Sequence, residues 1–335
     1  DEKFLIFDRI RQYKPDKAPV IARHSFKTLR HFHAAYSTTG RTRSFLKIQD
    51  GCDHWCSFCT IPMARGRSRN ASRESLQKQA QRIAKDGFKE VVITGVNVAD
   101  YGKTTGESLI LLLRKLEQVA GIERFRISSM EPELITDALI DFVAASPKFL
   151  PHFHVPLQSG SNDMLKAMRR RYTRELFADR LQAVKTAIPD AFIGVDVIVG
   201  FPGEMQEHFE DTYAFLQDIP ASFYHVFSYS DRPGTRASRM DNKVPSPQKK
   251  ERSRMLNELA EEKQLAFYNK QRNTNRQVLF EHQQHDGWMY GFTENYVKAA
   301  VPYQQELVNK IVPVKLRNLM PEGYFSAEIQ TAQVR

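Results

Sequence analysis

The chain has 335 residues, with 49 Lys and Arg against 39 Asp and Glu, which gives a formal net charge of +10. This length predicts one large core with a smaller module, and the basic balance favours a polyanionic partner such as nucleic acid. The sequence contains neither an apolar run long enough to span a membrane nor a charged-then-apolar signal segment at its start, which argues against a membrane or secreted protein.

Residues 1–43 are mixed and basic, and they contain Pro15, Pro19 and a break at Thr38-Thr39-Gly40. Prolines and a Thr-Thr-Gly break are typical of connecting segments. We therefore predict a lead-in or linker here rather than a domain.

Residues 44–240 alternate between short apolar runs and helical patterns. The expected strands are 43–49, 91–93, 125–128, 152–156, 192–199 and 222–227, and the expected helices are 72–86, 107–119, 136–145, 162–168, 174–188 and 205–218. Because this alternation demands right-handed crossovers, it predicts an α/β fold with a parallel sheet. We expect an open (β/α)6 part-barrel related to the triosephosphate isomerase barrel.

All the cysteines of the chain, Cys52, Cys56 and Cys59, follow the first expected strand with the spacing Cys-x3-Cys-x2-Cys. Clustered thiolates need a cation, and sulfur ligands favour zinc, copper or an iron-sulfur cluster. Structural zinc would need a fourth ligand, such as His54 or a distant histidine. Three unrelated buried cysteines are the remaining alternative. Such clustering without an even number of cysteines also indicates a reducing cytoplasm.

Small and polar residues follow the other strands, where a barrel of this kind collects its chemistry. They are Gly95, Asn97, Ser129, Glu131, Gln158 and Ser228. A glycine after a strand is usually a turn requirement, Glu131 could cap the next helix, and Gln158 could tie two loops together. Convergence of these loops on one rim nevertheless favours a ligand site.

The last part of the chain differs from the rest. Residues 241–275 are expected to form a charged helical connector with its helix at 248–272. Short strands expected at 278–281, 289–292, 297–300, 308–316 and 325–330 predict a small all-β barrel of the oligonucleotide-binding type over 276–335. Lys298, Lys310, Lys315 and Arg317 are candidate phosphate-binding residues, although a purely structural barrel is an alternative.

The cysteine motif, with Phe58 before its last cysteine, resembles the signature of radical S-adenosylmethionine (SAM) enzymes. The longer runs 47–66, 94–102, 156–161, 168–173, 196–204 and 229–235 resemble the methylthiotransferase branch, and 276–335 resembles its TRAM domain. The resemblance implies that Cys52, Cys56 and Cys59 ligate a 4Fe-4S cluster whose open iron binds SAM.

The same resemblance implies roles for other residues in binding SAM. Phe58 would lie beside the adenine, Gly95 and Asn97 would receive the methionyl end, and Gln158 and Arg170 would lie near the ribose and carboxylate. Asp196, Val197 and Ile198 would form the strand beside the adenine. Ser129, Glu131 and Ser228 complete the expected rim.

The stretches 126–132 and 225–235 resemble the branch that acts on threonylcarbamoyladenosine. This implies methylthiolation of carbon 2 of that nucleoside at position 37 of tRNA, beside the anticodon, after a 5′-deoxyadenosyl radical removes hydrogen. Other family substrates, isopentenyladenosine in tRNA or a ribosomal protein, remain alternatives, as does a non-catalytic RNA-binding module with a metal.

Family members carry further cysteines for a second 4Fe-4S cluster in an N-terminal domain, whereas this sequence has none before Cys52. We therefore expect residues 1–43 to be the lead-out of such a domain, absent from this sequence, and the second cluster only in a full-length protein. We further expect flavodoxin or ferredoxin as the electron donor, and a monomer.

Overall fold

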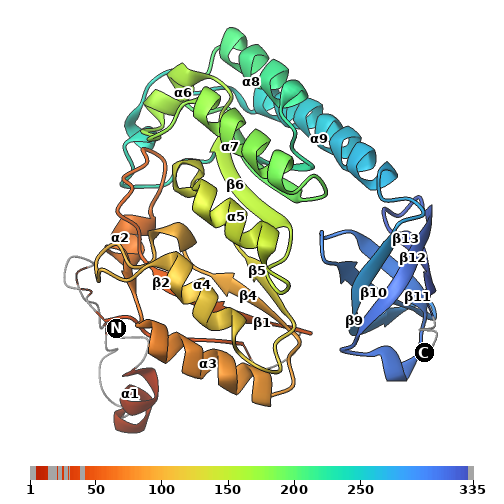
Figure 1. The fold of residues 1–335 in the computed structure, drawn as a ribbon. Coiled ribbons are helices and arrows are strands. Elements are labelled where there is room, and N and C mark those ends of the chain that lie inside the picture. The colour runs from red at the N-terminus through yellow and green to blue at the C-terminus, as the bar shows by residue number, and fades with distance from the viewer. Residues whose placement is uncertain are drawn as a thin grey trace.

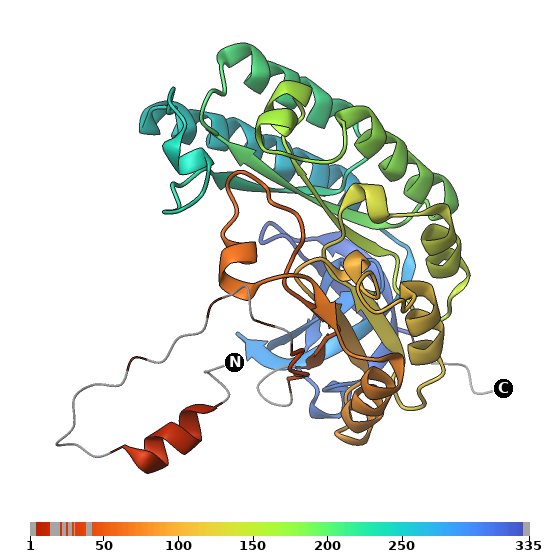
Figure 2. The ribbon, with the colours of Figure 1, turned by 90° about the vertical axis from the view of Figure 1, so that its left-hand side faces the viewer.

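The computed structural model describes residues 5–13, 21, 25, 29, 31–37 and 42–330. Pro15, Pro19 and the break at 38–40 lie outside the described residues. Helix α1 (Ile6–Gln12) buries none of its side chains and lies apart from the body of the molecule in Figure 2. Residues 35–37 run along the first strand, where Tyr36 bridges to Leu46 and Lys47 N–H donates to Ala35 O at 3.0 Å.

The larger part of the structure is the predicted part-barrel. Its strands are β1 (Arg43–Lys47), β4 (Glu90–Thr94), β5 (Arg124–Ile127), β6 (His152–Gln158), β7 (Phe192–Val199) and β8 (Phe223–Ser228), and every hydrogen-bonded pair among them is parallel. Its helices are α3 (Arg73–Lys85), α4 (Leu109–Glu117), α5 (Asp137–Ala145), α6 (Asn162–Ala167), α7 (Arg174–Ala187) and α8 (Gln206–Asp218). Figures 1 and 2 show these helices along the convex outer side of the strands.

Side-chain caps fix the starts of four of these helices. Ser72, Ser108, Thr136 and Thr173 each accept a hydrogen bond from the backbone N–H three residues later. A hydroxyl at this position pairs an N–H that the helix leaves unbonded. These caps explain why the predicted and observed helix starts agree closely.

The strand order is as predicted, but the sheet is divided. Hydrogen-bond ladders join β1-β4-β5 and β6-β7-β8 as separate three-stranded sheets. Between them, Phe125 forms an isolated bridge with Phe149, which precedes β6, and their rings stack at 5.1 Å. Phe125 N–H also donates to Lys148 O at 2.8 Å, and Leu150 N–H donates to Phe125 O at 2.9 Å, so one parallel bridge and this ring stacking join the two sheets.

Helix α9 (Ser246–Asn269) lies between the part-barrel and the C-terminal strands along the chain. Leu256, Leu259 and Ala260 are buried in the same core as β7 and β8, and Arg252 is only 2% exposed. Phe267 and Tyr268, near the end of the helix, are buried in the core of the C-terminal strands, so α9 packs against both units.

The C-terminal unit is a closed five-stranded barrel. It consists of β9 (Asn275–His285), β10 (Trp288–Thr293), β11 (Lys298–Pro302), β12 (Ile311–Leu319) and β13 (Phe325–Ile329), in the spatial order β10-β11-β13-β12-β9. Its interior is a core of its own that includes Val278, Phe280, Val314, Leu316 and Phe325. The predicted small all-β barrel is confirmed in its strands and closure.

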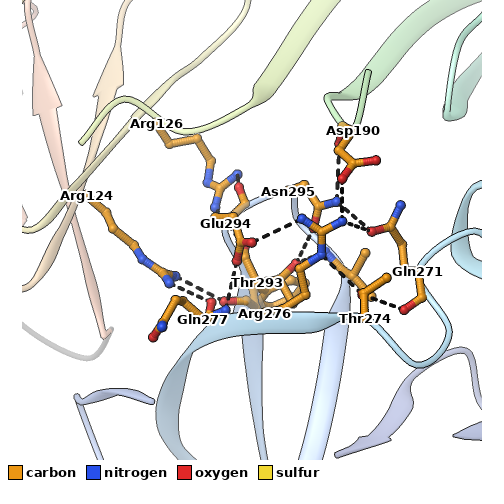
Figure 3. A network of polar contacts seen from close by, with 12 residues as sticks. Arg124, Arg126, Asp190, Gln271, Thr274, Arg276, Gln277, Thr293, Glu294 and Asn295 are labelled. Carbon is orange, nitrogen blue, oxygen red and sulfur yellow. Dashed lines mark hydrogen bonds and ion pairs between the residues drawn. The ribbon is translucent and has the colours of Figure 1, made fainter. Parts of the chain in front are cut away.

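The β-barrel contacts the amino ends of the part-barrel strands (Figure 1). Arg124 donates to Gln277 O at 2.6 Å and to Phe292 O at 3.3 Å, and Arg126 donates to Thr293 O and Glu294 O at 3.4 Å each (Figure 3). Asn295 and Arg276 both bind Asp190 from the barrel side. The cysteine loop follows β1 and so lies at the opposite, carboxyl end of these strands.

Within the described residues, no helix is both long enough and apolar enough to cross a membrane.

Candidate cofactor site

The cysteine loop is fastened at its base. Short strands β2 (Gln49–Asp50) and β3 (Arg69–Asn70) pair on either side of it, and Cys52 N–H donates to Gly66 O at 3.1 Å. Gly51 has a φ of 75°, and a Cβ there would lie 2.0 Å from Arg67 O, so this position requires glycine. Helix α2 (Ile61–Arg65) follows the last cysteine and ends at Gly66.

The three thiols are free and each sulfur accepts a hydrogen bond. His54 N–H lies 3.3 Å from Cys52 Sγ, Ile61 N–H lies 3.4 Å from Cys59 Sγ, and Arg170 Nη1 lies 3.0 Å from Cys56 Sγ. Such donors favour sulfur that carries negative charge. Burial, however, raises the pKa of Cys52 to about 12 and also raises the pKa of Cys56. Burial thus disfavours the thiolate forms of Cys52 and Cys56 in the absence of a cation, whereas a bound metal favours them, which fits a cluster.

Gln49 ties the cysteine loop to the loop after β4. Its buried amide accepts from Val96 N–H at 2.9 Å and Asn97 N–H at 3.0 Å, and donates to Gly51 O at 2.7 Å and Ser68 Oγ at 2.8 Å. A Cβ on residue 95 would lie 3.0 Å from Gln49 Oε1, so Gly95 permits this close approach. Gln49 was not among the site residues predicted from the sequence.

Asn97 is buried, yet neither polar atom of its side chain has a hydrogen-bond partner within the described part of the chain. Asp100, at the end of the short turn η3 (Val98–Asp100), has one buried carboxylate oxygen that also has no hydrogen-bond partner within the described residues. Buried polar groups without partners are costly, and in native proteins they are commonly completed by a ligand. Asn97 therefore fits the predicted role of binding the polar end of SAM.

Arg170 connects the rim to the cysteines. Besides Cys56 Sγ, its guanidinium donates to Tyr172 Oη at 2.9 Å and pairs with Glu131, which lies just before the turn η4 (Pro132–Leu134). Burial opposes the charge of Arg170, but Tyr172, Glu131 and Cys56 outweigh it and raise the pKa of the guanidinium. Burial raises the pKa of Glu131 to about 7, against the opposing effect of Arg170. Arg170 is thus a fixed cation beside the cysteine loop.

A cavity of about 390 Å³ adjoins Phe58 at the carboxyl ends of the second sheet. It is lined by Phe58, Gln158, Asp196, Ile198, Phe227, Ser228, Tyr229, Ser230 and Arg232. Five of the predicted site residues are therefore brought together here. Gln158 adopts a φ of 70° at the end of β6, which is a strained conformation for a residue other than glycine.

Val197 faces away from this cavity. Its side chain is fully buried in the apolar core, whereas Asp196 and Ile198 on either side line the cavity. Successive residues of a strand point to opposite faces, so only the backbone of Val197 is available to a ligand there. Of the three residues predicted on the strand beside the adenine, Asp196 and Ile198 thus line the cavity with their side chains.

The remaining predicted residues lie around the same rim or on the β-barrel. Ser129 is half-buried in the loop after β5, and Ser228 Oγ lies 2.9 Å from Ser253 Oγ of α9. On the barrel, Lys310 is exposed, Lys315 and Arg317 share one face of β12, and Arg317 pairs with Glu328. Lys298 lies 4.6 Å from the Tyr290 ring centre and lines a cavity toward the part-barrel.

Comparison with known proteins agrees with this geometry. The model of the radical SAM superfamily matches residues 46–216. Threonylcarbamoyladenosine tRNA methylthiotransferase MtaB from Bacillus subtilis is 39% identical over 99% of this chain and 74% of its own length. MtaB from Thermotoga maritima is 36% identical over 97% of this chain and 74% of its own length, and MtaB from Aquifex aeolicus is 43% identical over 76% and 62%.

The chain belongs to the radical SAM tRNA methylthiotransferase family. Membership of this family implies a 4Fe-4S cluster, SAM and a tRNA substrate. Among solved structures, coproporphyrinogen III oxidase HemN from Escherichia coli has a TM-score of 0.50 at 15% identity, covering 82% of this chain and 66% of its own. The radical SAM methyltransferase TsrM from Kitasatospora setae has a TM-score of 0.50 at 16% identity, covering 58% and 38%. These two likenesses support the fold of this methylthiotransferase-family chain.

Proposed function

We propose that this chain is the cofactor-binding and RNA-binding part of an enzyme that places a methylthio group on carbon 2 of N6-threonylcarbamoyladenosine at position 37 of tRNA. The observation that carries the reaction class is the set of free, hydrogen-bonded thiols on a loop that Gln49 joins to the backbone of Asn97, whose own amide is unpartnered among the described residues. The substrate rests on the relatives from Bacillus subtilis and Thermotoga maritima, whose names specify threonylcarbamoyladenosine and which span nearly the whole chain.

Different residues would hold the cluster and SAM. Cys52, Cys56 and Cys59 would hold the 4Fe-4S cluster, and Asn97 would pair with a polar group of SAM. When bound, the reduced cluster and SAM supply the carbon radical that removes hydrogen from the substrate. The chain positions these groups and excludes water from them, since the loops that form the site are locked together by Gln49.

Arg170 would act as a fixed counter-charge. Its guanidinium already contacts Cys56 Sγ and pairs with Glu131, so it is held beside a proposed cluster ligand and a carboxyl group. A planar guanidinium suits a carboxylate because it offers paired donors. Phe58 and Ile198 supply apolar walls to the cavity beside it, which suits a purine ring.

The β-barrel would bind tRNA as a TRAM domain. Lys310, Lys315 and Arg317 offer cations on its outer surface, which would position the tRNA backbone rather than read its sequence. We further propose a flavodoxin or ferredoxin as electron donor, a monomeric cytoplasmic enzyme, and a second 4Fe-4S cluster as the source of sulfur in the full-length protein.

A second candidate is methylthiolation of isopentenyl-type adenosine. A tRNA-2-methylthio-N(6)-dimethylallyladenosine synthase from Pelotomaculum thermopropionicum is 37% identical over 81% of this chain and 62% of its own length. The two candidates differ only in the group on N6. The ribosomal-protein alternative would not need a basic barrel.

Binding and turnover with defined tRNAs test these alternatives. The anaerobically reconstituted chain receives SAM, a reductant and tRNA that carries threonylcarbamoyladenosine, isopentenyladenosine or unmodified adenosine at position 37. We expect the first tRNA to bind most tightly and to stimulate 5′-deoxyadenosine formation most. Equal stimulation by the isopentenyl tRNA would favour the second candidate.

Charge reversal on the barrel tests the RNA surface. Lys315→Glu with Arg317→Glu should weaken tRNA binding and reduce its salt dependence, because fewer counterions are released. Lys85→Glu, an exposed cation on α3, is the matched control. If the barrel variant binds tRNA as the control does, the proposed RNA-binding face is wrong.

A further inference from the structure

Two histidines and one carboxylate meet on three neighbouring strands of the part-barrel, where His154 and Asp196 are half-buried and His225 is exposed. His154 on β6, Asp196 on β7 and His225 on β8 each offer one ligand atom, and these atoms all lie within 4.8 Å of one another. His154 Nε2 lies 2.7 Å from Asp196 Oδ1, and the two imidazole ring centres are 5.2 Å apart. None of these contacts involves the cysteine loop.

The strand register explains why these side chains converge. Asp196 and His225 are direct partners in the parallel ladder of β7 and β8, and His154 is the partner of Gly194. Because Gly194 has no side chain, nothing on β7 separates His154 from His225 at that level. The ideal Cβ of residue 194 would lie 3.6 Å from His225 Nε2, which shows how near the imidazole lies to this backbone.

The ring of His225 has no hydrogen-bond partner among the described residues, although the ring packs against Phe223. An imidazole ring without a hydrogen-bond partner, next to a His–Asp pair, is suited to coordinate a metal ion.

The three side chains of the cluster also line two different cavities. Asp196 lines the cavity that contains Phe58, while His154 and His225 line a second cavity of about 480 Å³. The second cavity reaches the β-barrel at Tyr296 and Lys298. A group bound by the three side chains would therefore be accessible from the cofactor cavity and from the barrel cavity.

We propose that His154, Asp196 and His225 form a binding site for one divalent transition-metal ion, distinct from the site of the three cysteines. Two imidazoles and one carboxylate are a ligand set for Zn²⁺, Fe²⁺ or Mn²⁺. Three protein ligands leave room in the coordination sphere for water or an oxygen of a substrate. The inference does not depend on which nucleoside is the substrate.

Zinc binding to the cluster-loaded chain tests the proposal. The chain is reconstituted anaerobically, so that its cysteines are occupied, and dialysed against chelator-buffered Zn²⁺. Zinc, iron and sulfide are then measured per chain. We expect one zinc per chain with the iron and sulfide content unchanged.

Variants assign the zinc to these residues. His225→Gln and, separately, Asp196→Asn should weaken zinc binding at least about tenfold, since even outer partners of metal ligands have effects of that size. His285→Gln is the matched control because His285 forms an exposed pair with Asp286, at 3.0 Å, outside the cluster. Iron content and circular dichroism equal to those of the unmodified chain verify that a variant is folded.

The outcomes separate the proposal from an ordinary hydrogen-bonded pair. Loss of zinc in either folded cluster variant, with retention in His285→Gln, supports the metal site. Absence of zinc from the unmodified chain, or equal zinc in the chain and both cluster variants, overturns it. Zinc gained only as iron is lost would place it at the cysteines and would also overturn it.

Discussion

At the scale of single residues, Arg170 binds Cys56, Tyr172 and Glu131 with one guanidinium in a buried position. Removing the cation would leave the Glu131 carboxylate without its partner, and a broken buried ion pair typically costs about 3–5 kcal/mol. We expect Arg170→Met to lower the free energy of unfolding by about 3 kcal/mol, as measured by urea denaturation. Arg169→Met, the exposed neighbour, should change it by less than about 0.5 kcal/mol. Equal losses in the two variants would contradict the assigned contacts.

We expect the buried amide of Asn97 to lower the stability of the SAM-free chain and to strengthen SAM binding. Its buried amide has no partner within the described chain, so replacing it with an apolar side chain removes a desolvation cost. We expect Asn97→Leu to raise the free energy of unfolding of the SAM-free chain by about 1 kcal/mol. The same change should weaken SAM binding, measured by equilibrium dialysis, at least about tenfold.

The control for Asn97 is Asn162→Leu, since Asn162 is exposed and pairs with Glu175 on α7. That variant should leave SAM binding unchanged. If Asn97→Leu binds SAM as tightly as the unmodified chain, Asn97 does not face the ligand.

Sequence patterns predicted many of the candidate site residues, because these residues lie close to one another in the sequence or directly after predicted strands. The cysteines stand within eight residues of one another, and Phe58, Asn97 and Gln158 all follow strands. Gln49 and His154 were missed because their partners, Val96 and Asp196, lie 47 and 42 residues away. Neither local spacing nor composition predicts such distant pairs.

At the scale of elements, α9 shows how a charged helix can belong to a core. Arg252 donates to Glu204 Oε1 at 2.5 Å and to Glu204 O at 3.1 Å, which fastens the helix to the loop after β7. Burial raises the pKa of Glu204, against the opposing hydrogen bonds from Gly200 and Arg252. The sequence could not distinguish this arginine from the solvated ones beside it, because the distinction depends on where Glu204 lies.

Substitution of Arg252 tests the attachment of α9. Arg252→Met should lower the free energy of unfolding by about 3 kcal/mol, since it leaves Glu204 buried without its cation. Arg254→Met, which breaks an exposed pair with Glu251 and Glu258, should lower the free energy of unfolding far less, because solvent screens that pair. Urea denaturation of both variants measures the difference, and a similar loss in each would contradict the buried role of Arg252.

At the scale of the whole molecule, the β-barrel is docked on the amino ends of the strands by buried charge. Glu90 is 1% exposed and lies 3.2 Å from Arg126 and 3.8 Å from Arg124, whose guanidinium groups also bind barrel carbonyls. Sequence patterns predicted both barrels but not this interface, because the strand residues involved look like ordinary charged ends of strands. Their burial follows only from the tertiary arrangement.

Loss of this docking should expose the segment between the two units. Arg124→Met removes the donor to Gln277 O and Phe292 O, so we expect faster tryptic cleavage at the exposed Lys270 and Arg272. Lys89→Met, which breaks an exposed pair with Glu123 at the same end of the sheet, is the control. Unchanged cleavage in Arg124→Met would show that other contacts hold the barrel in place.

The central claim is that the cysteine loop and its rim form a site that cleaves SAM. The most direct measurement is 5′-deoxyadenosine released from SAM by the anaerobically reconstituted chain after addition of a reductant. We predict steady formation by the unmodified chain, together with bound iron and sulfide, and loss of both product and iron in Cys56→Ala. Absence of 5′-deoxyadenosine from the iron-loaded chain, or undiminished formation by Cys56→Ala, would contradict it.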